Sequence, residues 1–417
     1  MVEKIFDRGL RTKIIKFLPD REAIVILGAR QTGKTTLLRL LQKEIQPPGQ
    51  PFCFDLENSR HLEILNSGPE ELIQYLKISG ANLTVKNYLL IDEVQYLSNP
   101  SKFIKLMVDH YSNKFKLILT GSSALLIKMK FKDSLVGRKF VFNLYPLSFR
   151  EFLIFKNEEK LASLLPDNPF IQKDDPGRFF SQDYQRYLQE FLIYGGFPRV
   201  ALEADKEKKI KVLGEIVDSY IYQDIRSLFR LKDIAKFNQL VKILAAQSSG
   251  LLNIQELSKS VGLPRATISN YLTILQDTYI LALISPYFTN KKKEVVKSPK
   301  AYFLDTGLRN YLIGNLSFSS TRDDIGRLLE NLALASLLKR KEEGSNLCFW
   351  RAKNGTEVDF IIQEDGHLFP LEIKRLGKSH RGLLSFLKRY KVERGYIAHQ
   401  SDFKQEAKFT YLPIWWL

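Results

Sequence analysis

The chain has 417 residues, of which 44% are hydrophobic and 26% charged, and its formal net charge is +17. This length exceeds what one hydrophobic core usually serves, so we expect two or three domains. No apolar run approaches the ~20 residues of a membrane-spanning helix, and the first residues lack the apolar core of a secretion signal. We therefore expect a cytoplasmic protein with no membrane partner. The basic excess favours nucleic acid as a partner over a merely basic surface.

The two cysteines, Cys53 and Cys348, lie far apart in the sequence, each in apolar surroundings. We expect buried thiols here rather than a disulfide or a metal site, in agreement with a cytoplasmic location.

The first strong motif is Gly28-Ala29-Arg30-Gln31-Thr32-Gly33-Lys34-Thr35, which matches the phosphate-binding loop G-x-x-x-x-G-K-[ST] at every fixed position. An apolar run at 23–27 precedes it, as in a buried parallel strand, and a helical pattern follows from Thr36. The two glycines allow backbone N–H groups to approach phosphate oxygens. Lys34 would contact the outer phosphates of ATP, and the Thr35 hydroxyl would ligate Mg²⁺.

A second strand is predicted over 52–57, and a further apolar strand, over 88–91, ends in Asp92 and Glu93. Such a strand delivers carboxylates to the edge of a nucleotide site. We predict that Asp92 holds Mg²⁺ through water and that Glu93 is the general base for the attacking water. The pattern is common by itself, but its place downstream of a complete phosphate loop makes it specific.

Two further features of this region remain open to two interpretations. The strand predicted over 116–119 leads to Thr120-Gly121-Ser122-Ser123, which either senses the γ-phosphate or caps a helix predicted over 123–130. Arg138 is either a charge-stabilising finger, acting within or between subunits, or an ordinary surface arginine.

Residues 1 to about 230 resemble the AAA+/STAND-related P-loop ATPases of archaea and bacteria. The matching segments are GARQTGKTTLL (28–38), YLLIDEVQ (88–95), LTGSSA (119–124), GRKFVFNLYPLSFREF (137–152) and YGGFPRV (194–200). The resemblance places residues 120–122 at sensor 1, Arg138 at a finger-like position and Pro198 near the adenine of the nucleotide. The residues themselves indicate only a tight turn at 195–198. We expect the polar stretch 157–183 to be a loop or lid insertion.

The middle of the chain predicts a winged helix. Two helices are predicted over 209–228 and 232–247. A helix, a glycine-containing turn and a second helix follow over 254–275, and a hairpin over 280–304 would be the wing. Outward residues of the second helix could reach a DNA groove: Arg265, Thr267, Ser269, Asn270 and Thr273. Lysines of the wing would contact phosphates: Lys291, Lys292, Lys293, Lys297 and Lys300. The alternative is a structural lever without DNA contact.

The last hundred residues place acids on a helix and on strands. Glu330 lies on a mostly apolar helix predicted over 325–341, and strands are predicted over 347–352, 356–363 and 368–375. Asp359 lies on the second strand, while Glu372 and Lys374 share one face of the third. A helix over 380–391 and strands over 395–398 and 410–416 complete the domain. The alternative interpretation is a solvated strand face with alternating charges.

This order resembles the restriction-endonuclease-like PD-(D/E)xK fold. The resemblance implies that Asp359 and Glu372 bind Mg²⁺ or Mn²⁺, that Glu330 is a supporting acid and that Lys374 orients the attacking water. Val358 stands where that fold has its proline. A basic strip over 372–394 favours a polyanion beside this site.

We therefore predict an α/β protein with a parallel-sheet, AAA+-like P-loop ATPase domain (1–204), a helical and winged-helix domain (205–314) and an α/β restriction-endonuclease-like domain (315–417). The leading hypothesis is a DNA-associated ATPase, with ATP/ADP and DNA as partners, whose nucleotide cycle drives or regulates a Mg²⁺-dependent nuclease. One alternative is a STAND-type signalling switch, and the other is a DNA-remodelling ring motor, each with an inert nuclease-like domain. The chain could also form a homo-oligomer. The whole order resembles a prokaryotic family of fused ATPases.

Overall fold

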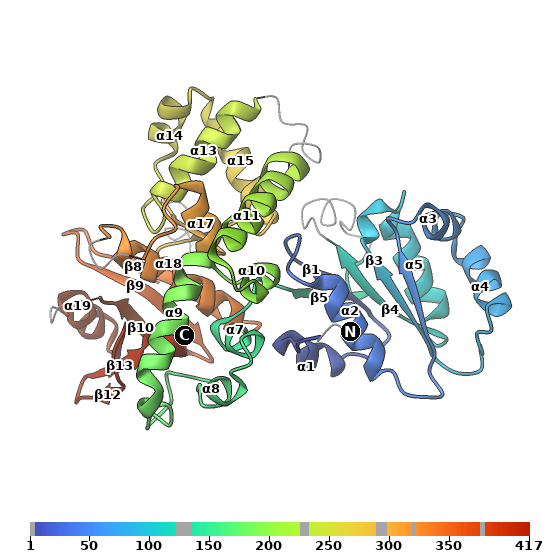
Figure 1. The fold of residues 1–417 in the computed structure, drawn as a ribbon, viewed down its shortest axis with the longest axis horizontal. Coiled ribbons are helices and arrows are strands. Elements are labelled where there is room, and N and C mark those ends of the chain that lie inside the picture. The colour runs from blue at the N-terminus through green and yellow to red at the C-terminus, as the bar shows by residue number, and fades with distance from the viewer. Residues whose placement is uncertain (1–4, 122–134, 226–232, 289–297, 319–321, 376–379) are drawn as a thin grey trace. The chain divides into compact units, whose positions relative to one another are not determined.

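The computed structural model describes residues 5–121, 135–225, 233–288, 298–318, 322–375 and 380–417. The chain forms two compact units (Figure 1). Unit 1 comprises residues 1–145 and 277–279, and unit 2 comprises residues 146–276 and 280–417.

Unit 1 is built on a five-stranded, fully parallel sheet in the order β2-β3-β4-β1-β5. The strands are β1 (Ala23–Leu27), β2 (Pro51–Asp55), β3 (Asn87–Asp92), β4 (Phe115–Gly121) and β5 (Lys139–Asn143). Leu27 lies opposite Gly121 in the register, and Asp55 lies opposite Asp92. The carboxyl ends of the strands therefore share one edge of the sheet, the edge at which open α/β sheets bind ligands.

Helices cover both faces of this sheet. On one face lie α1 (Gly9–Ile15) and α2 (Lys34–Glu44), and on the other α3 (Ser59–Asn66), α4 (Pro69–Ile78) and α5 (Pro100–Tyr111) (Figure 1). Ile24 and Ile26 pack in the first core, whereas Val25 and Leu27 pack in the second. This double burial explains why β1 reads as an unbroken apolar run.

Unit 2 begins with helices, of which those before residue 205 had been assigned to the ATPase domain from the sequence. They are α7 (Phe149–Phe155), α8 (Glu159–Ser163), α9 (Ser181–Tyr194), α10 (Pro198–Leu202) and α11 (Lys206–Ile216), followed by a π-helix (Val217–Asp224). The α9 helix packs on α17 (Thr306–Leu312), where Asn310 Nδ2 donates to the carbonyls of Leu192 and Ile193, both at 3.0 Å. These buried bonds hold residues 146–204 to unit 2, so the predicted boundary at residue 204 does not coincide with a division of the structure.

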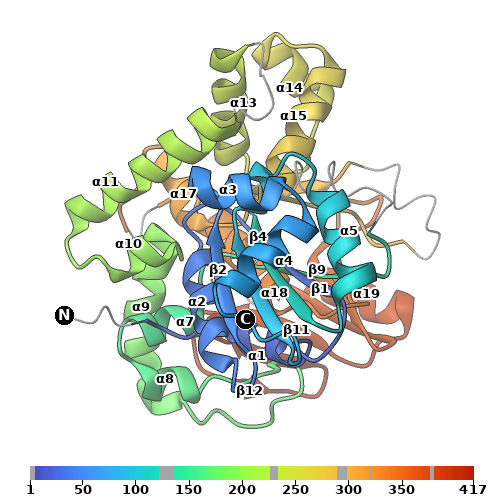
Figure 2. The same ribbon diagram turned by 90° about the vertical axis from the view of Figure 1, so that its right-hand side faces the viewer.

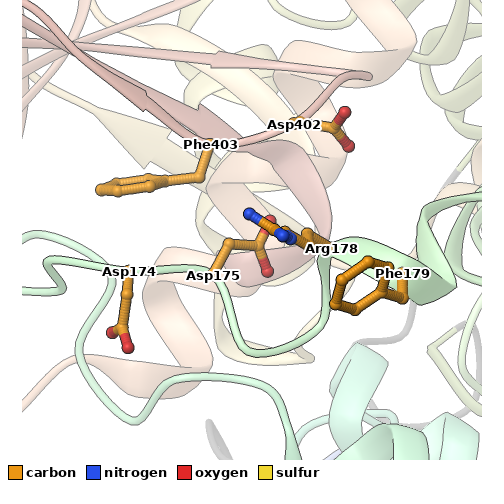
Figure 3. A pocket seen from close by; sticks show the side chains of 6 residues that line it. All are labelled: Asp174, Asp175, Arg178, Phe179, Asp402 and Phe403. Carbon is orange, nitrogen blue, oxygen red and sulfur yellow. The ribbon is translucent and has the colours of Figure 1, made fainter.

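The stretch 157–183, predicted as a loop or lid insertion, instead packs within unit 2. Phe170 stacks on Phe369 with ring centroids 5.2 Å apart, and its carbonyl accepts a hydrogen bond from the Tyr396 hydroxyl at 3.1 Å. The same stretch forms one wall of a pocket (Figure 3), whose lining residues are Asp174, Asp175, Arg178, Phe179, Asp402 and Phe403. Its aromatic residues supply the apolar contacts that keep it on the domain.

Three helices and a small sheet follow in the order that the sequence predicted. They are α13 (Ile234–Ala246), α14 (Ile254–Val261), α15 (Arg265–Asp277) and the antiparallel pair β6 (Leu281–Ile284) and β7 (Lys300–Phe303). Figures 1 and 2 both show α13, α14 and α15 side by side. Gly262, in the left-handed region at φ 67°, ends α14 and allows the turn into α15.

The C-terminal part of unit 2 is a six-stranded mixed sheet in the order β12-β13-β11-β10-β9-β8. Its elements are α18 (Ile325–Arg340), β8 (Asn346–Arg351), β9 (Glu357–Glu364), β10 (His367–Ile373), α19 (Arg381–Tyr390), β11 (Gly395–His399), β12 (Lys404–Gln405) and β13 (Phe409–Pro413). The α19 helix contributes Leu383 and Phe386 to a core with Trp350 and Ile397 of the sheet. Three 3₁₀ turns, Val94–Tyr96, Arg178–Phe180 and Ile414–Trp416, complete the described elements.

The cysteines differ from their prediction in one case. Both are free, and Cys348 is buried, but Cys53 is exposed. Cys53 lies on β2, which is an edge strand of its sheet, so one side of this strand has no neighbour to cover it. Its apolar sequence context therefore overstated its burial.

Candidate functional site

The phosphate loop joins β1 to α2 at the carboxyl edge of the sheet in unit 1. A Cβ at Gly28 would lie 2.2 Å from the carbonyl oxygen of Leu144, so only glycine fits beneath the loop. Gly33, at φ 93°, is the residue immediately before α2. Within the loop, the Thr32 hydroxyl donates to the Ala29 carbonyl at 2.8 Å. The loop is thus held by its own backbone and presents the N-terminus of α2, a site suited to phosphate.

Lys34 is the buried cation of this loop. Its side chain folds back so that Nζ donates to the carbonyls of Ala29 at 2.9 Å and Gly28 at 3.3 Å. Burial lowers the pKa of Lys34, while the charges of Glu93 and Asp92 act in the opposite direction. An ammonium group that has lost its water is stabilised by an added anion, as an ATP phosphate would be.

Three sheet-edge residues converge next to this lysine. Thr35 Oγ1 donates to Asp92 Oδ2 at 2.6 Å, which joins the start of α2 to the end of β3. The Thr120 hydroxyl at the end of β4 donates to the other oxygen of Asp92 and accepts the backbone N–H of Glu93 at 3.1 Å. Thr120 therefore positions both acids at once.

Glu93 occupies an unusual backbone conformation. Its φ of 56° lies in the left-handed region, which non-glycine residues seldom adopt and which recurs at functional sites. This conformation turns the chain directly after β3, and Gln95 Nε2 donates to the Glu93 carboxylate. The carboxylate of Glu93 therefore bonds to Gln95, whereas the carboxylate of Asp92 bonds to Thr35 and Thr120.

The oxygen ligands at this edge fit Mg²⁺. A threonine hydroxyl and a carboxylate oxygen in direct contact are the hard donors that this ion prefers, and both lie at the loop that would hold phosphates. When bound with a nucleotide, Mg²⁺ would neutralise charge on the phosphate oxygens. Thr35 and Asp92 would hold it in place.

Arg8 is a residue of this site that the sequence analysis did not identify. The residue is only 4% exposed, and its guanidinium group donates to the carbonyl of Thr32, in the loop, at 2.6 Å and to that of Tyr145 at 2.8 Å. It thus fastens the loop to the chain that follows β5. A single arginine near the start of the chain belongs to no motif, so no sequence signal marked it.

The structure places Arg138 away from the phosphate loop. The Arg138 carbonyl accepts the backbone N–H of Ala23, the first residue of β1, and its side chain pairs with Asp109 at 2.6 Å. It therefore lies at the opposite edge of the sheet, one strand length or roughly 16 Å from the loop. This position rules out contact with a phosphate in the same unit, and a role between subunits stays a prediction.

The remaining predicted nucleotide contacts fall in three groups. Arg30, Gln31 and Thr36 lie in or directly after the loop. Ser122 lies outside the described residues. Pro198 begins α10 in unit 2, where the neighbouring Gly196 N–H donates to Asp305 at 2.7 Å, so its role beside adenine stays a prediction.

The acids predicted for a nuclease site have partners other than a metal. Glu330 accepts hydrogen bonds from Lys300 Nζ at 3.0 Å and from the Tyr302 hydroxyl at 2.6 Å. In the described part of the chain, no group of three or more His, Cys, Asp or Glu side chains is arranged to hold a metal ion. The carboxylate of Glu330 is therefore compensated by protein groups, and metal binding by these acids stays a prediction.

The other predicted members of that site are also engaged. Asp359 Oδ2 accepts the backbone N–H of Ile373 at 2.8 Å. Glu372 Oε1 accepts the N–H of Leu383 at 3.2 Å, and its other oxygen lies 3.1 Å from Lys374 Nζ. The Glu372–Lys374 pairing on one strand face thus agrees with the predicted spacing.

The prediction that Lys300 contacts DNA phosphates from the wing is wrong. Its side chain is only 5% exposed and faces Glu330 and Glu357. The other four wing lysines, at 291–293 and 297, lie outside the described residues.

The parallel sheet, the phosphate loop after β1, Asp92 at the end of β3 and Thr120 near the end of β4 define an α/β P-loop ATPase. Residues 20–153 match the family described as "AAA domain". Residues 185–319 and 325–417 each match a family described as "Domain of unknown function", DUF8612 and DUF4143 respectively.

Relatives extend the match beyond the ATPase core. Uncharacterized protein MJ1544 of Methanocaldococcus jannaschii is 31% identical over 367 residues, which cover 86% of this chain and 75% of the relative. The chain belongs to the same family as that protein. Uncharacterized protein MJ1637 of the same organism is 28% identical over 431 residues, which cover 99% of this chain and 88% of the relative.

Among solved structures, the chain is similar to the Walker-type ATPase PABY2304 of Pyrococcus abyssi. That match has a TM-score of 0.47 at 15% identity and covers 74% of this chain and 96% of the other. Among the described residues, no helix is long and apolar enough to cross a membrane.

Proposed function

We propose that the chain is a DNA-associated ATPase that binds ATP with Mg²⁺ at the Gly28–Thr35 loop and hydrolyses it with Glu93 as general base. The observation that carries this proposal is the hydrogen-bonded set of Thr35, Asp92, Thr120 and Glu93 beside Lys34. These residues come from three separate elements and meet at one edge of the sheet.

Each residue has a distinct task in this proposal. Loop N–H groups and Lys34 bind the β- and γ-phosphates, and Thr35 and Asp92 orient the metal on them. Glu93 accepts the proton of the attacking water, and the Thr120 hydroxyl fixes its backbone. Arg138 is offered to the nucleotide of a neighbouring subunit in a homo-oligomer, since its own loop is out of reach.

The DNA partner is proposed on the α14–turn–α15 arrangement, which we interpret as a winged helix. The outward residues Arg265, Ser269, Asn270 and Thr273 are exposed, whereas Ile268 and Tyr271 are buried. An exposed polar helix face on a chain of net charge +17 suits a phosphate backbone.

The C-terminal domain is proposed to be inert as a nuclease. The leading hypothesis of the sequence analysis required Asp359 and Glu372 to share a Mg²⁺ or Mn²⁺ ion. The internal partners of Asp359, Glu372 and Glu330 favour instead the alternative, in which this domain binds without cutting.

The test is steady-state ATP hydrolysis with and without duplex DNA, together with binding of a fluorescent ATP analogue. Glu93→Gln should abolish turnover and keep nucleotide affinity, while Lys34→Ala should lose both. The control is Glu63→Gln, the same change on an exposed helix position of unit 1. Unchanged turnover in Glu93→Gln would refute the general base, and turnover that DNA never alters would refute the DNA partner alone.

A further inference from the structure

A buried lysine reaches into the acidic cluster of the C-terminal domain from a different element. Lys300 is the first residue of β7, and its Nζ pairs with Glu330 of α18 at 3.0 Å and with Glu357 at the start of β9. The side chain is only 5% exposed, so water cannot solvate its ammonium group. The charge is therefore compensated by protein carboxylates.

The surrounding electrostatics keep this group charged. Burial would lower the pKa of Lys300, but the charges of Glu330, Glu357 and Asp359 raise it above its usual value. In turn, burial and Asp359 raise the pKa of Glu330, while Lys300 and the Tyr302 hydroxyl lower it. The four charged groups thus form one interacting set of three acids around one cation.

The set contains the acidic side chains that are typical of a metal site, but a lysine ammonium group lies among them. Divalent cations in proteins are held by several carboxylate oxygens in a polar pocket. Here the position between Glu330 and Glu357 is taken by an ammonium group, and both oxygens that face it are already bonded. The position between Glu330 and Glu357 therefore does not fit a resident Mg²⁺ or Mn²⁺ ion.

We propose that the Lys300 ammonium is the resident cation of this cluster and replaces the divalent metal that a nuclease of similar fold would bind. The proposal goes beyond ATP hydrolysis and does not depend on it. Because Lys300 belongs to the β6–β7 sheet, the same ion pair fastens that sheet to α18 and β9 within unit 2. The domain is then a binding and assembly module held together by an internal charge.

The experiment measures Mn²⁺ binding by electron paramagnetic resonance, and thermal unfolding with and without Mn²⁺, on the full chain without nucleotide. An Asp92→Asn background removes the carboxylate of the ATPase site. With Lys300 present, we expect no bound Mn²⁺ and no change in Tm. Lys300→Met should lower Tm by several degrees, bind about one Mn²⁺ per chain and recover Tm when the ion is added.

The control is Lys209→Met. Lys209 is another buried lysine of unit 2, and it pairs with a single carboxylate, Glu190, at 2.9 Å. It should lose stability without gaining an ion, because one carboxylate cannot hold a divalent cation.

Two results would overturn the proposal. One is Mn²⁺ bound to the protein with Lys300 intact and lost on Asp359→Asn or Glu372→Gln. The other is a folded Lys300→Met protein that binds no Mn²⁺. If Lys300→Met does not fold, Lys300→Met/Glu330→Gln, which removes one charge of each sign, should fold and bind no ion, and a bound ion there would also contradict the proposal.

Discussion

Thr120 is the residue whose replacement most directly tests the geometry of the ATPase site. Its hydroxyl donates to Asp92 and accepts the Glu93 N–H at 3.1 Å, so it joins the acid proposed to hold the metal to the proposed general base. Thr120→Val preserves the shape of the side chain in its fully buried position but removes both hydrogen bonds. Asp92 keeps its bond from Thr35, and Lys34 is untouched.

The expected effect is on turnover rather than on nucleotide affinity. Losing a buried hydrogen bond costs about 1–3 kcal/mol, and most of this cost would fall on the placement of Glu93. A barrier increase of about 1.4–2.7 kcal/mol corresponds to a roughly 10- to 100-fold fall in kcat. The affinity for ATP should change by less than about threefold, because the loop and Lys34 are unaltered.

The assay is a coupled ATPase measurement alongside titration with a fluorescent ATP analogue. The matched control is Thr84→Val, because the Thr84 hydroxyl is exposed and bonds only locally, to Asn82 at 2.7 Å. Equal kcat in Thr120→Val and Thr84→Val would refute the role of the hydroxyl. A large loss of ATP affinity with kcat retained would show that Thr120 supports the loop instead of the acids.

Two further predictions follow from buried charged groups. Arg8→Met should weaken ATP binding about 5- to 30-fold with a smaller change in kcat, since it frees the Thr32 carbonyl from a charged donor; equal ATP affinity measured by titration would contradict this. Burial alone would raise the pKa of Asp324, but hydrogen bonds from Arg322 and Arg309 lower it to about 2. The unfolded chain then takes up this proton first, so about 2 kcal/mol of unfolding free energy, present above pH 4, should be lost as the pH falls towards 2. Urea unfolding of wild type and Asp324→Asn should show this pH dependence in the wild type alone, and identical pH dependence would disprove it.

Local motifs predicted the elements around the phosphate loop well because these elements follow one another directly in the sequence. The strand, the loop and the helix around Gly28–Thr35 are contiguous, and the apolar run before Asp92 marks a strand that is covered on both faces. Arg8 and the double bonding of Thr120 depend on contacts between elements that are far apart in sequence. No single-sequence pattern specifies such contacts.

The C-terminal elements were predicted to within about two residues at most ends, yet their chemistry was not. Period-2 alternation placed β8, β9 and β10, and the charged pair Glu372 and Lys374 lies as the spacing implied. What the sequence could not show is that Lys300, assigned to an exposed wing, is inserted among those acids. Its immediate neighbours in sequence are Pro299 and Ala301, whereas its partners lie 30 and 57 positions further along the chain.

The segment after α15 connects the proposed DNA-reading helix to the ATPase sheet. Residues 277–279 belong to unit 1, where Thr278 is fully buried and the Tyr279 hydroxyl donates to Asn143 Oδ1 at 2.6 Å. Asn143 lies opposite Leu27 in the sheet register, directly before Gly28. The next residue after Asn143 contributes the carbonyl that crowds Gly28. A substitution of Tyr279 should therefore affect the end of β5, which supports the phosphate loop. Within unit 1, Tyr279 is thus joined to the phosphate loop through Asn143, Leu144 and Gly28.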